Sequence, residues 1–180
     1  MTSYALFLRG INLGSINRVA MADLRALLTE LGYDDVRTHL QSGNAVFSAS
    51  DTTPAKLERA IEAAITERLA LSIRCVVRTA DELRAVIDAN PFQGTATNPA
   101  RFLVVFFSGV PDPADIAALD AGDFAPDEYR FGERELYLWC PDGVGTSKLA
   151  KAATPKPRNK VVGTARNWNT VTKLLAMTDA

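Results

Sequence analysis

Hydrophobic and polar positions in the first half of the chain follow two different periods. Short apolar runs predict strands at residues 4–8, 36–40, 45–48 and 71–77. Between these runs, apolar residues recur every three or four positions and predict two helices, one beginning near Met21 and one at Pro54, after the capping residue Thr53. The order strand, helix, strand, strand, helix, strand is that of the ferredoxin-like, or split β-α-β, arrangement.

The second half of the chain repeats this alternation. Thr79 and Glu82 have the spacing of a capping box and predict a helix that ends near Asn90. Residues 102–107 are the most apolar run and predict a central strand. The remaining expected elements are a helix from 113 to about 119, strands at 127–131 and 135–140, a short helix at 146–152, a last strand at 160–162 and a helix from 168. No residue pattern is shared between the halves, so the repeat is one of architecture.

These elements predict an α+β fold of two ferredoxin-like lobes, with mixed or antiparallel sheets and helices packed on them. We place the N-terminal lobe at residues 1–79 and a C-terminal α+β lobe of similar architecture at residues 80–180. One continuous α+β sheet without duplication is the alternative.

Composition narrows the class of protein. A chain of 180 residues with 47% hydrophobic residues is long enough to bury a sizeable core. A pI near 5.9 argues against a general nucleic-acid coat protein, which needs a strongly basic domain. Cys75 and Cys140 form no Cys-x-x-Cys pair, and the apolar run at residues 4–8 is too short for a signal peptide or a membrane span. We therefore expect a cytoplasmic protein without a membrane partner.

Charge is distributed unevenly along the chain. Residues 143–178 contain seven basic residues and no acidic one, so the remainder of the chain carries a formal charge of about −8. Residues 110–135 contain eight acidic residues and two arginines. Such a dipole favours an anionic ligand, or the pairing of one molecule with another as a homodimer. Ordinary solvated surface charge is the alternative interpretation.

Three polar segments carry candidate binding chemistry, and the first is residues 8–18. Its glycines allow backbone N–H groups to face a ligand, and its arginines can bind phosphate or carboxylate through two hydrogen bonds. It matches neither the phosphate-loop nor the dinucleotide pattern. Its candidate ligand-binding residues are Arg9, Gly10 and Asn12. A long loop whose asparagines and glycines only form turns is the alternative.

The second segment is the turn at residues 41–44. Gln41, Ser42 and Asn44 offer amide and hydroxyl groups to a polar ligand if this turn lies beside the first segment. The same residues are common turn formers, so a simple hairpin turn is the alternative.

The third segment, residues 164–170, comes just before the final helix. Thr164 or Asn167 is expected to cap that helix, which would leave Arg166 and free N–H groups at its positive end, where an anion is stabilised. The candidate ligand-binding residues of this segment are Arg166, Asn167 and Asn169. Trp168 has the spacing of a core residue, which favours packing over stacking on a base.

The sequence assigns no catalytic residue. His39 is the only histidine, and no serine or cysteine is recognisably paired with it. No cluster of His, Cys, Asp and Glu indicates a metal, and no motif indicates a cofactor.

Together, the three segments resemble the bacterial family called domain of unknown function 1697, over nearly all of the chain. The matching positions are Arg9, Gly10, Asn12 and Gly14, then Gln41, Ser42, Gly43 and Asn44, then Arg166, Asn167, Trp168, Asn169 and Thr170. Ser15 and Ala165 depart from the family pattern, in which glycine and a hydroxyl residue are common. The resemblance implies a two-lobed α+β protein, each half related to the ferredoxin-like arrangement, and no established activity.

Three functions remain open from the sequence. The first is a binding module for a small anionic or nucleotide-like ligand, or an exposed nucleic-acid end, in a polar cleft between the lobes. Arg9 and Arg166 would hold its negative charge, and the amides of Asn12, Gln41 and Asn44 would orient it. The second is an enzyme that acts on a phosphorylated or nucleotide substrate by electrostatic stabilisation. The third is a structural protein whose motifs only cap helices and form turns.

Overall fold

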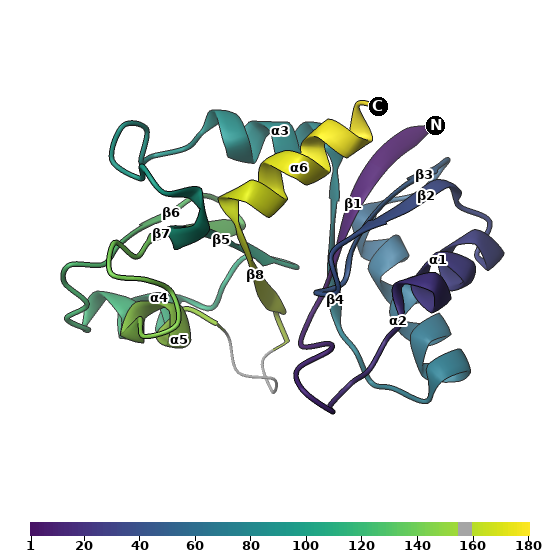
Figure 1. The fold of residues 1–180 in the computed structure, drawn as a ribbon, viewed down its shortest axis with the longest axis horizontal. Coiled ribbons are helices and arrows are strands. Elements are labelled where there is room, and N and C mark those ends of the chain that lie inside the picture. The colour runs from purple at the N-terminus through teal and green to yellow at the C-terminus, as the bar shows by residue number, and fades with distance from the viewer. Residues whose placement is uncertain (155–159) are drawn as a thin grey trace. The chain divides into compact units, whose positions relative to one another are not determined.

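A computed structural model of the protein describes residues 1–154 and 160–180 (Figure 1). These residues form two compact units, one of residues 1–84 with 173–180 and one of residues 85–172. Each unit contains a four-stranded antiparallel sheet with helices, so the predicted α+β fold with two lobes is confirmed. Residues 173–180 belong to the first compact unit, whereas the sequence analysis assigns them to the second lobe.

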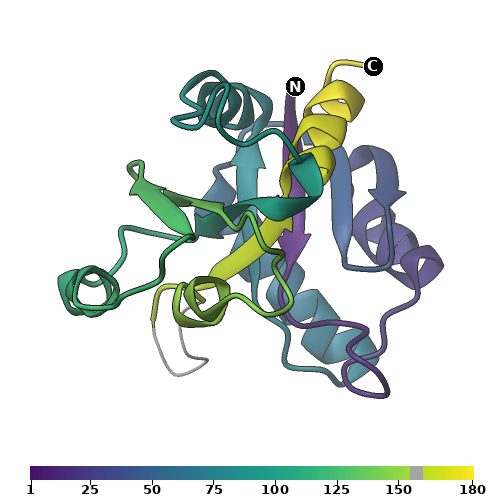
Figure 2. The same ribbon diagram turned by 60° about the vertical axis from the view of Figure 1, so that its left-hand side comes forward.

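The first unit follows the split β-α-β order that its sequence predicts. Its elements are β1 (Thr2–Leu8), α1 (Met21–Glu30), β2 (Asp34–His39), β3 (Asn44–Ala49), α2 (Pro54–Leu69) and β4 (Cys75–Thr79). The strands lie in the order β2-β3-β1-β4 with every neighbour antiparallel. The turned view in Figure 2 shows β1, in purple, between its two neighbours.

Local signals explain where the helices of this unit begin and end. The Thr53 side chain accepts a hydrogen bond from Lys56 N, and Pro54 occupies the first helical position of α2, as predicted. α1 and α2 cover one face of the sheet (Figure 1), where Leu6, Phe47 and other apolar side chains form the core.

At the edge strand β4 of this sheet, glutamate side chains accept hydrogen bonds from backbone N–H groups. Three alternate backbone N–H groups of β4 donate to carboxylates at 2.9 Å: Cys75 N to Glu62, Val77 N to Glu58 and Thr79 N to Glu82. Unpaired N–H groups on an edge strand invite pairing with another chain, so these carboxylates both satisfy the backbone and protect the edge.

After a 3₁₀ turn, the second unit repeats the order strand, helix, strand, strand, helix, strand. Its elements are the 3₁₀ turn η1 (Pro99–Arg101), β5 (Phe102–Phe107), α4 (Pro113–Asp120), β6 (Glu128–Phe131), β7 (Glu135–Trp139), α5 (Lys148–Ala152) and β8 (Gly163–Asn167). The antiparallel strands lie in the order β6-β7-β5-β8, so the most apolar run, β5, is a central strand, as predicted.

The last strand differs from the sequence prediction. Residues 160–162 were expected to form it, but β8 begins at Gly163 and contains Thr164 and Arg166. The prediction relied on apolar residues, whereas β8 is held in place by its backbone pairing with β5, from Leu103↔Asn167 to Phe107↔Gly163. Because Thr164 and Arg166 are polar, the sequence of this strand shows no apolar pattern from which it could be predicted.

Two further helices, α3 (Ala80–Asp88) and α6 (Trp168–Thr178), each contribute residues to both units. The predicted capping box of α3 is confirmed, because Thr79 Oγ1 accepts from Glu82 N at 3.1 Å. In the first unit, Arg84 forms ion pairs with Asp81 and Asp179.

Replacing Glu62 with alanine removes the acceptor of Cys75 N–H and the ion-pair partner of Arg74, whose Nε lies 3.0 Å from Glu62 Oε1. We expect the free energy of unfolding to fall by about 1–2 kcal/mol, because bonds to charged acceptors contribute more than neutral ones but this pair is partly exposed. Urea unfolding measures the change. Glu62→Gln keeps an acceptor oxygen and should lose less than half as much. Equal losses in the two variants would contradict a role for the acceptor.

Candidate functional site

The first two predicted segments meet in the first unit. Figures 1 and 2 show the loop of residues 9–18, in dark purple, projecting between β1 and α1. The Asn12 side chain fixes this loop, since its Nδ2 donates to Val19 O at 2.9 Å and its Oδ1 accepts from Val19 N at 2.9 Å. The same Nδ2 donates to Gln41 O at 2.6 Å, which joins the loop to the turn. We call residues 9–19 together with 40–44 the Asn12 junction.

The turn packs directly against the loop at Gly43. Leu8 N donates to Gly43 O at 2.8 Å. Gly43 has a φ of +83°, and a Cβ built there would lie 2.7 Å from both Ile11 Cδ1 and Leu8 Cβ. Only glycine combines this backbone conformation with such a close approach.

The Asn44 side chain is fully buried and organises the turn from inside. Its Nδ2 donates to His39 O and to Ser42 Oγ, both at 2.9 Å. The Asn12 and Asn44 amides are therefore engaged within the protein, which favours a positioning role for both over direct contact with a ligand.

Arg9 is the half-buried cation of the Asn12 junction. Its backbone N donates to Arg74 O at 2.9 Å, which brings two arginines to the same place. Burial, and then the neighbouring charge of Arg74, lowers the pKa of Arg9. Gly10, beside it, is exposed and accepts a hydrogen bond from Asn17 Nδ2 at 3.0 Å.

Three large apolar side chains of the Asn12 junction face solvent. The exposed fractions of Leu13, Ile16 and Leu40 are 64%, 64% and 57%. Leu13 and Ile16 form an isolated bridge in the loop, and Leu40 directly precedes Gln41, the residue to which Asn12 binds. Single exposed apolar residues are common, whereas two on the loop and a third on the turn to which it is bound favour a contact surface. The sequence analysis missed them because their separate places in the chain gave no pattern.

The third predicted segment lies in the second unit and is largely internal. Arg166 is on β8 with 8% of its surface exposed, and its Nη1 donates to Thr164 Oγ1 at 2.9 Å and to Ala165 O at 2.8 Å. Burial lowers the pKa of Arg166 to about 10. Asn167 caps α6, because its Oδ1 accepts from Thr170 N at 3.0 Å. Asn169 is exposed on the first turn of that helix.

Trp168 is partly buried in the second unit. Its ring stacks on Phe102 with centroids 4.6 Å apart and an interplanar angle of 21°. Its ring therefore packs on a core side chain, while part of its surface stays exposed.

The structure reveals a residue pattern shared by the two halves, which the sequence analysis did not find. Arg78 on β4 and Arg166 on β8 are both buried and both donate to the carbonyl of the preceding residue. Each is followed by a residue that caps the next helix, Thr79 for α3 and Asn167 for α6. The match between Arg166 and Arg78 favours a structural role for both guanidinium groups.

Both cysteine thiols are enclosed, whereas His39 is partly exposed. Cys75 and Cys140 are buried free thiols, and burial, then the charge of Glu62, raises the pKa of Cys75 well above its usual value. His39 has a lowered pKa, through burial and then the charge of Lys173. Within residues 1–154 and 160–180, no group of three or more His, Cys, Asp and Glu side chains is arranged to hold a metal ion. None of the helices in this part of the chain has the length and apolar content needed to cross a membrane.

Comparison with known proteins places the chain in a family. The family model described as "Protein of unknown function (DUF1697)" matches residues 1–137. The chain belongs to the DUF1697 family. A similar solved structure, that of the conserved bacterial protein SP0830 from Streptococcus pneumoniae, is 26% identical in sequence. The likeness covers 98% of each chain with a TM-score of 0.81, which supports the DUF1697 fold described above. Comparison with curated proteins gives no match.

The junction of this DUF1697 protein can be tested at two of its glycines. Gly43→Ala should lower the free energy of unfolding by about 2–4 kcal/mol, because a strained φ and an overlap with Ile11 and Leu8 act together. Gly10→Ala is the matched control: its φ is +63°, but no atom lies within 4 Å of the added Cβ, so about 1 kcal/mol is expected. Chemical denaturation measures both. Equal losses would mean that the turn does not pack tightly on the loop.

Proposed function

We propose that the protein is a binding module for a small anionic, nucleotide-like ligand, which contacts the Asn12 junction. The observation that carries the proposal is the half-buried Arg9 beside Arg74, on a rigid loop that also exposes Leu13 and Ile16. Cationic and apolar groups together suit a ligand with a charged end and a flat apolar end.

The charged end is attracted by two guanidinium groups. Arg74 shares its charge with Glu62 at 3.0 Å, while the pKa of Arg9 is lowered by burial and by Arg74. A phosphate or carboxylate near Arg9 relieves this repulsion and forms charge-assisted hydrogen bonds in a partly desolvated place.

The apolar end is attracted by Leu13, Ile16 and Leu40. Covering these side chains removes apolar surface from water, at about 25 cal/mol per Å². The Asn12 hydrogen bonds hold the loop before the ligand arrives, so little ordering entropy is lost on binding.

The remaining candidate residues divide between contact and support. Gly10, Gln41 and Ser42 have exposed surface at the Asn12 junction and are proposed to contact the ligand. Asn12 and Asn44 are proposed to position the loop and the turn. Direct contacts from the Arg166 segment, including Asn167 and Asn169, stay a prediction from the sequence, and the internal bonds of Arg166 do not favour one.

A structural role without a ligand is the competing function. It is favoured by the internal hydrogen bonds of Asn12, Asn44 and Asn167, each of which stabilises a turn or a helix end. This alternative predicts that substitutions at the Asn12 junction change stability alone.

Titration of the protein with adenosine diphosphate, followed by calorimetry, separates the two functions. Arg9→Ala should weaken binding about tenfold, because a charge-assisted hydrogen bond contributes ~1.5–3 kcal/mol. Arg68→Ala is the charge-matched control, since Arg68 pairs with Glu30 on the exposed surface. The affinity of this variant for adenosine diphosphate should stay within about twofold of that of the unchanged protein. Equal affinities in the two variants would refute the Arg9 site.

The same titration tests the apolar end of the ligand. Inorganic pyrophosphate lacks a base and should bind more weakly than adenosine diphosphate, and Leu13→Ser should remove most of that difference. Higher salt should weaken both ligands, because screening reduces the attraction of exposed charges. A salt-independent affinity would argue against a charged ligand.

A further inference from the structure

The outer strand β6 of the second sheet has one open side. The sheet order β6-β7-β5-β8 places it at an edge, and within the described residues no strand pairs with its other side. Gly132 N donates to Glu135 O at 2.9 Å, and positions bonded to the neighbouring strand alternate along an antiparallel ladder. The backbone N–H and C=O groups of Tyr129 and Phe131 therefore point away from β7, toward the open side.

This edge differs from the edge at β4, whose N–H groups donate to three glutamates. In the part of the chain that the structure describes, no side chain accepts a hydrogen bond from the N–H group of Tyr129 or Phe131. The Tyr129 carbonyl accepts from Arg130 Nη1 at 2.7 Å, and a carbonyl oxygen has a second lone pair. Such an edge is a template on which another strand can pair.

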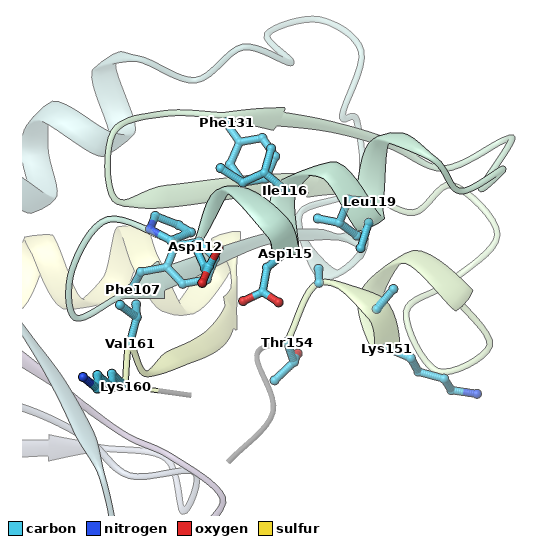
Figure 3. Close-up of a pocket in the computed structure, with 14 residues that line it drawn as sticks. Phe107, Asp112, Asp115, Ile116, Leu119, Phe131, Lys151, Thr154, Lys160 and Val161 are labelled. Atoms are coloured by element: carbon cyan, nitrogen blue, oxygen red, sulfur yellow. The ribbon is translucent and has the colours of Figure 1, made fainter. Parts of the chain in front are cut away.

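The side chains of β6 alternate between two faces. Tyr129 and Phe131 pack against the core, and Figure 3 shows the Phe131 ring turned toward α4, where it lines a pocket. Glu128 and Arg130 are exposed on the opposite face. The guanidinium carbon of Arg130 lies 5.4 Å from the centroid of the Phe92 ring. Because Arg130 Nη1 also reaches the Tyr129 carbonyl, its positive charge lies at the open edge.

We propose that β6 pairs with the same strand of a second copy of this chain, antiparallel and centred on Tyr129. In this register the Tyr129 N–H group of each copy donates to the Tyr129 carbonyl of the other, because both groups face the open side. Glu128 of each copy then lies opposite Arg130 of the other, on the same face of the joined sheets. Two-fold symmetry forms this charged pair twice.

Charge selects both this register and the partner. A shift by two residues keeps the backbone bonds and the faces, but it sets Arg130 opposite Arg130, or Glu128 opposite Glu128. Like charges directly opposite each other destabilise a sheet, whereas opposite charges stabilise it. The order acid, aromatic, base is complementary to itself when one strand is reversed, so a second copy is the partner that this edge fits. The pairing is independent of the Asn12 junction, because β6 lies in the second unit.

Sedimentation equilibrium of the full chain, from about 5 to about 500 µM, measures this pairing. A strand of 4 residues buries less surface than a standard interface, so we expect a weak dimer with a Kd on the order of 100 µM. The average mass should rise from that of the 19.5 kDa chain toward twice that value. A mass that stays at that of one chain throughout would overturn the proposal.

Hydrogen exchange followed by NMR locates the interface. The amides of Tyr129 and Phe131 should exchange more slowly as the protein concentration rises, because the dimer gives them acceptors. A concentration effect confined to other strands would show a different interface, and the proposal would then be wrong.

Charge reversal tests the two charged pairs. Glu128→Arg and Arg130→Glu each replace two attractive contacts with two repulsive ones, so each variant alone should dimerise about tenfold more weakly. An equal mixture of the two variants restores opposite charges at both pairs and should associate as tightly as the unchanged protein. A mixture that associates no better than either variant alone would refute the register.

Glu67→Arg is the charge-matched control for Glu128→Arg, since Glu67 is exposed on α2 in the other unit. The Kd for dimerisation of this variant should stay within about twofold of that of the unchanged protein. A loss equal to that of Glu128→Arg would show a general charge effect and contradict a role for β6.

Discussion

The candidate site depends on one side-chain amide, that of Asn12. A loop cannot rely on the regular hydrogen bonds of a helix or a sheet, so its backbone groups need other partners. Asn12 supplies them by accepting from Val19 N and donating to the carbonyls of Val19 and Gln41. These bonds close the loop on itself and attach it to the turn. This attachment holds the loop that carries Leu13 against the turn that follows Leu40, while Arg9 is held by its backbone bond to Arg74.

The same requirement, that polar groups near the interior find partners, shapes the rest of the two sheets. The free N–H groups of β4 are taken by Glu58, Glu62 and Glu82. The buried Arg78 and Arg166 donate to carbonyl oxygens of their own strands. Within the described residues, no buried side-chain nitrogen or oxygen lacks a hydrogen-bond partner. Motif residues that seem suited to a ligand in the sequence can therefore serve the fold, as Asn44 and Asn167 do.

Much of the fold was predictable because its signals are local. Thr53, the capping box of Thr79 and Glu82, and Asp112 before Pro113 mark three helix starts within a few residues each. β8 was misplaced because its polar residues carry no apolar period, and only pairing with β5 makes it a strand. The candidate site was predictable in part: the residues of the loop and the turn were found, but the difference between a half-buried Arg9 and a fully buried Asn44 was not.

The sequence by itself determined the order of strands and helices, the main helix caps and the membership of the DUF1697 family, because these depend on neighbouring residues and on motif identity. The tertiary structure alone decided that Asn12 reaches Gln41 and that Arg166 is enclosed. Hydrogen bonds and burial of this kind join residues far apart in the chain. Their geometry arises only when the backbone has folded, so no local pattern encodes them.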